Sequence, residues 1–206
     1  FFTAFVFWAI LKWENVAEEK HGYRWLILIS YMVGLSIGVH LLNLLAIPAI
    51  AFVYYFKKYK ASTKGIIFTG VISILILAFI MYFIIPTLVA SAGVFERFFV
   101  TRVVLPFNSG TLIYFIIVVS AIAFGLFYTH KHKKLIANTV ILAFTVLVIG
   151  YSSFFILVVR SNANTPIDEN NPEDALSLLA YLNREQYGDW PLLKGQYFNA
   201  PVVGRE

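Results

Sequence analysis

The sequence has no cysteine, and charged residues account for only 13% of its 206 residues. The lack of cysteine excludes a disulfide framework, thiolate catalysis and cysteine-ligated zinc or iron–sulfur centres. Soluble domains carry roughly 25% charged residues, whereas this chain is 60% hydrophobic with a mean hydropathy of +0.78. The composition therefore predicts an integral membrane protein.

Apolar runs long enough to cross the bilayer recur along the chain. A helix needs roughly 20 apolar residues to span the hydrocarbon, and lipid does not tolerate open sheet edges. We therefore predict an all-α fold, a polytopic transmembrane bundle of about six membrane segments. The predicted spans are Phe1–Leu11, which is truncated, two short helices within Trp25–Phe56, and Ile66–Val89, Thr111–Thr129 and Leu135–Val159.

The run Trp25–Phe56 is too long for one straight span, since a single helix would measure about 48 Å. His40 and Asn43 lie at its midpoint, and Pro48 interrupts its second half. Because proline breaks helices and buried polar residues are costly in lipid, we predict two short helices with a turn near His40.

The net charge of +5 does not indicate nucleic-acid binding, because most lysines fall in short connectors between spans. Positively charged loops mark the cytoplasmic side of a membrane. The hairpin at His40 places three basic connectors on that side, namely Trp13–Arg24, Lys57–Lys64 and His130–Lys134. The opposite, extracytoplasmic side then receives the His40 turn, the loop Val94–Gly110 and the C-terminal tail.

A composition change after Arg160 predicts a boundary between a bundle, residues 1–160, and an extracytoplasmic soluble segment, residues 161–206. Within the segment, Asn171 is a suitable N-cap and Pro172 a suitable first residue for an amphipathic helix ending near Tyr187. The chain also opens on Phe1 inside an apolar run, which predicts an internal fragment of a longer protein.

Polar side chains on the predicted extracytoplasmic side are the candidate site residues. His40 and Asn43 serve either as a hydrogen bond between helices or as ligands of a phosphate or sugar hydroxyl. The loop Val94–Gly110 alternates aromatic and charged residues and predicts an interfacial helix followed by a turn. Its Arg97 and Arg102 either anchor the loop at the membrane surface or bind phosphate, and Arg160 is a further phosphate candidate.

Other patterns carry no site. The acids Asp168, Glu169, Glu173 and Asp174 match no calcium loop, so we assign no metal. Ser30, Gly34 and Gly38 recur every four residues and predict close helix packing. The sequence contains no Walker loop, dinucleotide fingerprint or nucleophile elbow, and no complete catalytic constellation.

Three stretches carry a family resemblance: Gly34–Asn43, Leu105–Gly110 (LPFNSG) and Arg160–Pro172, which contains NTPIDENNP. They are similar to bacterial membrane proteins of formerly unknown function that are grouped with the vertebrate transmembrane protein O-mannosyltransferases. The resemblance implies a GT-C glycosyltransferase of the bacterial inner membrane. Such an enzyme transfers a sugar from a polyprenyl phosphate to a Ser or Thr hydroxyl of an acceptor protein, with membrane lipid around it and no cofactor beyond the lipid-linked donor.

The resemblance places the catalytic acid before the first residue of this chain, so the catalytic residues stay unknown. It makes Arg97, Arg102, His40, Asn43 and Arg160 the candidates for the donor phosphate. Two other classes stay open. A transporter or flippase is disfavoured because no acidic residue falls within the predicted spans. A noncatalytic scaffold would bind its partners through the tail.

Overall fold

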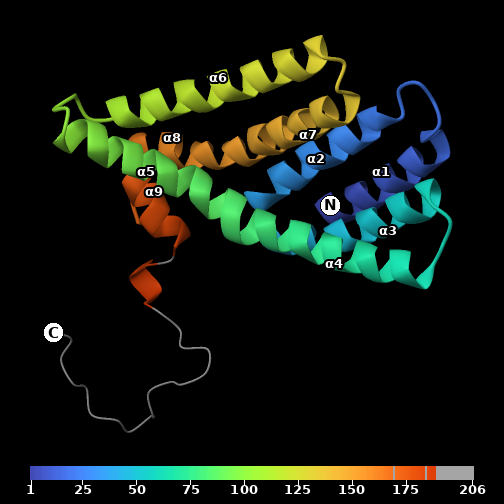
Figure 1. Ribbon diagram of the computed structural model, residues 1–206. Coiled ribbons are helices and arrows are strands. Elements are labelled where there is room, and N and C mark those ends of the chain that lie inside the picture. The colour runs from blue at the N-terminus through green and yellow to red at the C-terminus, as the bar shows by residue number, and fades with distance from the viewer. Residues whose placement is uncertain (169, 184, 189–206) are drawn as a thin grey trace, which may run out of the picture.

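The computed structural model describes residues 1–168, 170–183 and 185–188, and these residues are predominantly helical with no strand among them (Figure 1). This confirms the all-α prediction. The α-helices are α1 (Phe2–Val16), α2 (Tyr23–Ile37), α3 (Ala46–Lys58), α4 (Thr63–Phe79), α5 (Ile85–Thr101), α6 (Ser109–Lys131), α7 (Leu135–Tyr151), α8 (Ile156–Asn162) and α9 (Ala175–Leu182). Shorter 3-10 helices are η1 (Leu41–Leu45), η3 (Ser152–Phe155) and η4 (Glu185–Tyr187), and η2 (Ile80–Ile84) is a π-helix.

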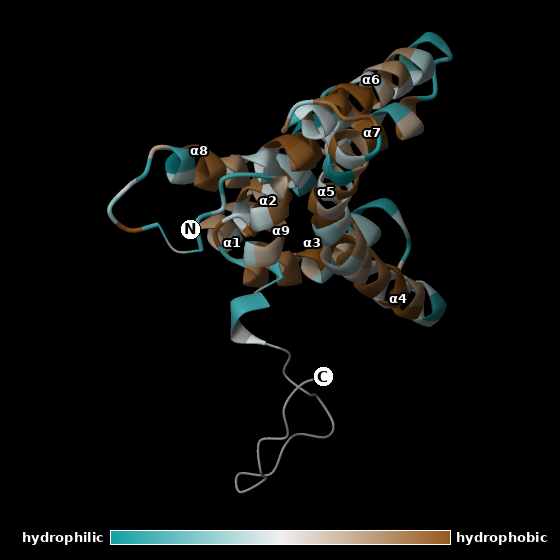
Figure 2. Ribbon diagram, turned by 90° about the vertical axis from the view of Figure 1, so that its left-hand side faces the viewer, coloured by the Kyte–Doolittle hydropathy of each residue, from teal (hydrophilic) through white to brown (hydrophobic). Residues whose placement is uncertain are grey.

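Four stretches are long and apolar enough to cross a membrane: Leu41–Lys58, Thr63–Thr101, Ser109–Lys131 and Leu135–Asn162. The apolar helix α2 is shorter, with 15 residues. Figure 2 shows that hydrophobic residues cover the outer faces of α4 and α6, while polar residues gather in the turns. Ile67, Phe68, Phe124 and Phe127 are each more than 60% exposed, as expected of side chains that face lipid. These features support a multi-pass membrane protein.

The predicted turn near His40 is confirmed. α2 ends at Ile37, and His40 has an extended backbone (φ −161°, ψ 118°) before η1 and α3 continue the chain. Pro48 is the third residue of α3. It is tolerated there because backbone N–H groups in the first helical turn have no intrahelical acceptor. The polar midpoint of the run, rather than the proline itself, marks the break.

The helix of the next predicted span does not end near Val89. α4, η2 and α5 form one continuous helical stretch of 39 residues that ends at Thr101 (Figure 1). Pro86 lies just after the π-helical turn Ile80–Ile84, and such a turn accommodates the missing N–H without ending the helix. The residues read as a separate surface helix from Val94 onward are therefore the last turns of α5. The turn predicted before Gly110 is present, between Arg102 and Asn108.

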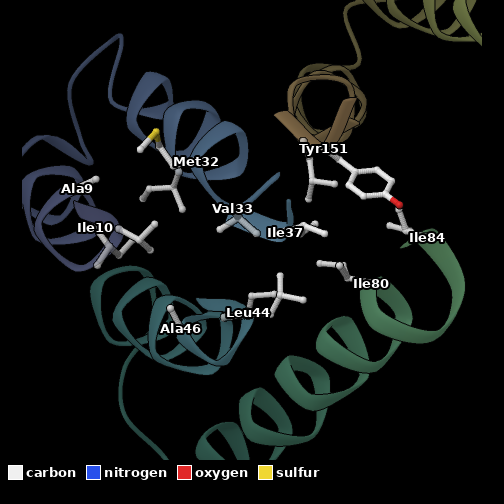
Figure 3. Packing of buried hydrophobic residues seen from close by; sticks show 14 of the residues in the cluster. Ala9, Ile10, Met32, Val33, Ile37, Leu44, Ala46, Ile80, Ile84 and Tyr151 are labelled. Atoms are coloured by element: carbon white, nitrogen blue, oxygen red, sulfur yellow. The ribbon is translucent and has the colours of Figure 1, made fainter. Parts of the chain in front are cut away.

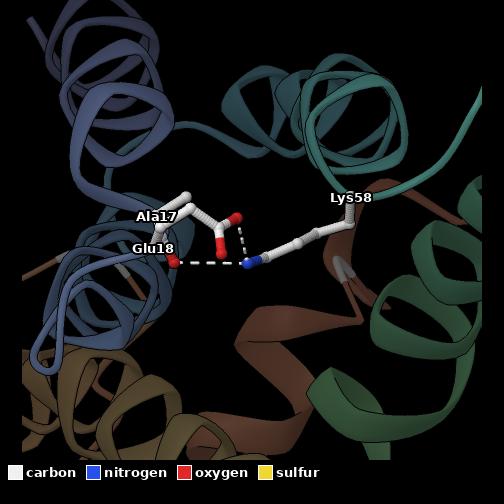
Figure 4. A network of polar contacts seen from close by, with 3 residues as sticks. All are labelled: Ala17, Glu18 and Lys58. Carbon is white, nitrogen blue, oxygen red and sulfur yellow. Dashed lines mark hydrogen bonds and ion pairs between the residues drawn. The ribbon is translucent and has the colours of Figure 1, made fainter.

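The basic connectors lie at one end of the bundle, as the hairpin prediction requires. Figure 1 shows the α1–α2, α3–α4 and α6–α7 connectors at the right-hand end and the α5–α6 turn at the left-hand end. Two of the basic connectors touch: Lys58 Nζ donates hydrogen bonds to Glu18 Oε1 at 2.8 Å and to the Ala17 carbonyl at 3.2 Å (Figure 4). That this end faces the cytoplasm stays a prediction.

The Glu18–Lys58 pair gives a testable pH effect. The hydrogen bond from Lys58 and then its positive charge hold the pKa of the exposed Glu18 carboxyl below its ordinary value. Because the folded pKa is the lower one, the contact contributes at neutral pH and is lost as the pH falls through that folded value. In an NMR titration, Lys58→Met is expected to raise the pKa of Glu18 toward that of an exposed glutamate. Identical titration in both proteins would show that the pair does not form.

The core lies where α1, α2, η1, the π-helical turn and α7 meet. Side chains from these elements point toward one another in Figure 3, including Ile10, Val33, Leu44, Ile80 and Tyr151. Among helices, α2 runs closest to α7. A Cβ built on Gly34 would lie 2.1 Å from the Leu147 carbonyl oxygen, and one on Gly150 would lie 2.5 Å from the Tyr31 carbonyl oxygen. The close approach predicted at Gly34 is thus present.

The tail helix begins three residues later than predicted. α9 starts at Ala175 and is capped by Asp174, whose carboxylate accepts hydrogen bonds from the backbone N–H groups of Leu176 and Ser177 at 2.8 Å each. Asn171 does not cap the helix because its backbone is left-handed (φ 44°). α9 ends at Leu182 rather than near Tyr187, which belongs to η4. The tail beyond residue 188 lies outside the described residues.

α9 packs on the membrane bundle. Its Leu178 is 2% exposed within the main hydrophobic core, and a Cβ on Gly93 of α5 would lie 3.0 Å from Leu176 Cδ2. The small Gly93 therefore lets the helix approach α5 closely. The first part of the predicted tail is a fixed part of the bundle end.

Candidate functional site

His40 lies at the turn between α2 and η1, with a defined hydrogen-bonding state. Its Nδ1 accepts a hydrogen bond from the Leu42 backbone N–H at 3.2 Å, and its own backbone N–H donates to the Ser36 carbonyl at 2.7 Å. A neutral imidazole with an acceptor Nδ1 carries its proton on Nε2. The exposed His40 therefore offers one outward donor, Nε2–H. Nδ1 is not available to a ligand in this cap, because it already accepts from Leu42 N–H.

Asn43 is buried, with 4% of its surface exposed. Its Nδ2 donates to Ser36 Oγ at 2.8 Å, and Ser36 Oγ donates to the Val33 carbonyl at 2.7 Å. These bonds fasten η1 to α2, which is the interhelical role considered for Asn43. The Asn43 Oδ1 atom has no hydrogen-bond donor among the described residues.

A cavity of about 780 Å³ opens at the His40 turn. Its lining is Val39, His40, Leu41, Leu42, Leu44, Leu45, Met81, Tyr181, Leu182 and Gln186. Ligand cavities typically measure about 300–1,000 Å³ and combine apolar walls with a few polar groups, and this lining has that character. Residues from four elements, η1, η2, α9 and η4, meet at it. The cavity is therefore a candidate for a small polar group on an otherwise apolar molecule.

An apolar groove of about 640 Å³ runs between α2, α3 and α4 toward the basic connectors. Ile80 lines this groove, whereas its neighbour Met81 lines the His40 cavity. The groove extends along α4 as far as Gly65, about 22 Å from Ile80 at 1.5 Å per residue. The His40 cavity and the apolar groove therefore meet the same π-helical turn at neighbouring residues.

Arg97 and Arg102 do not reach this cavity. Arg97 is 16 residues beyond Met81 on continuous helix, about 24 Å along its axis, and Arg102 is about 32 Å away. Both arginines are exposed, and their five-residue spacing separates them by about 140° around the axis. Arg160, also exposed, lies in the last turn of α8. The five predicted phosphate ligands thus do not converge on one point.

Glu96 is a site residue that the sequence analysis passed over. Only 1% of it is exposed, although it lies within the 39-residue helical stretch. Its Oε1 accepts from the Asn108 N–H at 2.5 Å, and its Oε2 accepts from the Thr111 N–H at 2.8 Å and the Thr111 hydroxyl at 3.0 Å. The carboxylate caps the N-terminus of α6, where the helix dipole favours negative charge. It is therefore a buried structural cap with its oxygens occupied.

Glu96 bears on the argument against a transporter, which rests on the absence of acidic residues from the predicted spans. It lies beyond the predicted span end at Val89 but within the same 39-residue helical stretch. The sequence places Glu96 in the predicted loop Val94–Gly110, which does not indicate a buried carboxylate. Its partner Asn108 is 12 residues away, and the contact between them joins the end of one helix to the start of the next.

A second polar cluster fastens the chain after α8. The buried Ser161 hydroxyl lies 2.7 Å from Asp168 Oδ2 and 2.9 Å from Asn171 Oδ1, and Asn162 Nδ2 donates to the Glu173 carbonyl at 2.9 Å. These contacts organise the motif NTPIDENNP around the end of α8. Within residues 1–168, 170–183 and 185–188, no three His, Asp or Glu side chains gather as a metal site would require.

Comparison with known proteins gives one result on the N-terminal part. Residues 1–63 match the family model of the Protein O-mannosyl-transferase TMEM260 N-terminal domain. No curated protein and no solved structure matches the chain. The matched residues form α1, α2, η1 and α3, so they include His40 and Asn43 but not the three arginines. Residues 1–63 are thus related to the N-terminal domain of the TMEM260 protein O-mannosyl-transferases, an association that suggests a glycosyltransferase.

Proposed function

We propose that the protein is a GT-C membrane glycosyltransferase that transfers a sugar from a polyprenyl phosphate to a Ser or Thr hydroxyl of an acceptor protein. The observation that carries the proposal is the match over residues 1–63, because these residues supply the His40 wall of the cavity. The proposal places the reaction on the extracytoplasmic side of the bacterial inner membrane, opposite the basic connectors.

The cavity and the groove suit the two parts of such a donor. In the proposal the phosphate and sugar occupy the His40 cavity, and the isoprenoid chain follows the apolar groove from Ile80 toward Gly65. His40 Nε2–H donates a hydrogen bond to a phosphate oxygen, while Nδ1 stays bound to Leu42 N–H. A charge-assisted hydrogen bond of this kind is stronger than one between neutral groups.

The reaction forms a bond between the acceptor oxygen and the sugar's anomeric carbon and breaks the bond from that carbon to the phosphate oxygen. The acceptor hydroxyl loses its proton to a base, and the carrier phosphate leaves with an added negative charge. His40 stabilises that charge in the proposal. Glu96 is not nominated as the base, because its buried carboxylate already accepts three hydrogen bonds.

Three variants of the full-length protein test the location of the phosphate. His40→Ala is expected to lower transfer by about 10–100-fold, the range for losing a hydrogen bond to a charged group. Arg97→Ala and Arg102→Ala are expected to have smaller effects because of their distance from the cavity. The measurement is transfer of labelled sugar from polyprenyl phosphate in detergent, and Arg24→Ala at the opposite end is the matched charge-removal control.

Loss of transfer in Arg97→Ala and Arg102→Ala, with normal transfer in His40→Ala, would move the phosphate from the cavity to the α5–α6 turn. Unchanged transfer in all three variants would remove these residues from the donor site. Each variant is compared at equal amounts of folded protein, judged by gel filtration and circular dichroism.

A further inference from the structure

The His40 cavity has a second wall that the family match does not cover. Tyr181 and Leu182, at the end of α9, and Gln186 in η4 line it together with the His40 turn. We infer that Tyr181 and Gln186 recognise the sugar of the lipid-linked donor, while His40 binds its phosphate. This inference rests on the proposed function and adds the residues that select the sugar.

The helix α9, which carries Tyr181, packs firmly on the bundle. Leu178 of α9 is 2% exposed in the core, and Leu176 packs over Gly93 of α5. The Asp174–Ser177 capping box fixes where α9 begins: Ser177 Oγ accepts from the Asp174 N–H at 3.0 Å, and Asp174 accepts from the Ser177 N–H at 2.8 Å. Tyr181 therefore occupies a defined position, one helical turn after the buried Leu178.

The chemistry of this wall fits a sugar better than a second phosphate. A sugar ring presents hydroxyl groups at its edge and C–H groups on its faces. The Gln186 amide both donates and accepts hydrogen bonds, and the Tyr181 hydroxyl does the same beside an apolar ring. Neither residue carries a positive charge, and two further lining residues, Leu182 of α9 and Met81 of η2, are apolar. Neutral groups that both donate and accept hydrogen bonds, placed beside an apolar surface, can distinguish sugars that differ in the positions of their hydroxyl groups.

The two walls therefore divide recognition between chain segments far apart in sequence. His40 belongs to the residues related to the transferase family, whereas Tyr181 and Gln186 lie more than a hundred residues later. Only a sugar with a matching pattern of hydroxyl groups makes both the Gln186 and the Tyr181 hydrogen bonds, which gives this wall its selectivity.

The test is donor binding to the full-length protein in detergent, using polyprenyl phosphate mannose and bare polyprenyl phosphate as two probes. Gln186→Ala and Tyr181→Phe are each expected to weaken binding of the mannose-bearing probe by about 3–10-fold, the loss of one neutral hydrogen bond. Binding of the bare probe is expected to stay unchanged. His40→Ala is expected to weaken binding of both probes.

Two controls match the variants: Asn183→Ala changes a neighbouring tail amide that does not line the cavity, and Tyr23→Phe removes a hydroxyl at the basic end. Equal weakening of both probes by Gln186→Ala and Tyr181→Phe, or no weakening, overturns the inference. So does wild-type protein that binds the two probes equally. Each of these three outcomes overturns the sugar site without contradicting the proposed transfer reaction. Conversely, wild-type protein that distinguishes the two probes but transfers no sugar overturns the proposed reaction and keeps the sugar site.

Discussion

Glu96→Ala is expected to lower the free energy of unfolding by about 3 kcal/mol, because it leaves three donors at the start of α6 without their acceptor. A buried polar group that loses its partner costs about 1–3 kcal/mol, and water replaces part of the lost bonding. Gly110 makes the loss harder to absorb: a Cβ there would lie 2.5 Å from Glu96 Cα, so the two helices have little room to shift. Thermal unfolding in detergent measures the change.

Glu96→Gln separates charge from shape. The glutamine side chain keeps one oxygen that can accept hydrogen bonds. Its amide N–H₂ replaces the second carboxylate oxygen and faces donors that no longer have an acceptor. It is expected to fall between wild type and Glu96→Ala in stability. Glu14→Ala, which removes an exposed carboxylate on α1, is the control and is expected to have little effect. Equal stability of Glu96→Ala and Glu14→Ala would mean that the cap does not support the fold.

Gly34→Ala is expected to destabilise the protein by about 1–3 kcal/mol, because the added methyl group meets the backbone of α7. Its Cβ would lie 2.1 Å from the Leu147 carbonyl oxygen, and backbone cannot rotate away as a side chain can. α2 and α7 must therefore move apart, and Gly150 on the facing helix shows the same crowding. The shift also carries the His40 turn, which follows α2 directly, so transfer is expected to fall with stability.

Gly70→Ala is the matched control for Gly34→Ala. Its Cβ would meet only Phe52 Cζ at 3.6 Å, an ordinary contact, and alanine favours helix by about 1 kcal/mol over glycine. It is expected to leave stability unchanged or to raise it. The measured quantities are the unfolding temperature in detergent and the rate of sugar transfer. A Gly34→Ala protein as stable as Gly70→Ala would show that the close α2–α7 approach is not required.

Much of the membrane layout could be predicted from the sequence, because length and charge act over whole segments. The run Trp25–Phe56 is too long for one span, and its polar midpoint at His40 predicted the break that the structure contains. Lysines in three connectors predicted that those connectors share one end of the bundle. The number of spans follows from the thickness of the hydrocarbon, and the common side of the basic connectors follows from the excess of Lys and Arg in cytoplasmic loops.

The features that could not be predicted from the sequence depend on contacts between helices, or on which of two nearby residues ends or caps a helix. The alternating charges after Val94 resemble a surface helix, but helical hydrogen bonding simply continues to Thr101. Glu96 finds its partners only once α6 folds back on α5. In the tail, Asn171 and Asp174 both suit an N-cap, and the Asp174–Ser177 pair wins because its two hydrogen bonds are reciprocal.

The candidate site was predicted only in part for the same reason. His40 was chosen as a polar residue inside an apolar run, and it does line a cavity. Arg97 and Arg102 were grouped with it because they share its end of the bundle. Sharing an end does not imply contact, and the length of α5 separates the two groups. Tyr181 and Gln186 were not candidates, since only the packing of α9 on α5 brings them to the cavity.

The most direct test of the central proposal is transfer by the full-length wild-type protein in detergent, with polyprenyl phosphate bearing a radiolabelled sugar and an exported protein as acceptor. We expect label on the acceptor protein that β-elimination releases, as for a sugar linked to Ser or Thr. Folded protein that yields no labelled acceptor with any polyprenyl phosphate sugar tested would contradict the glycosyltransferase proposal.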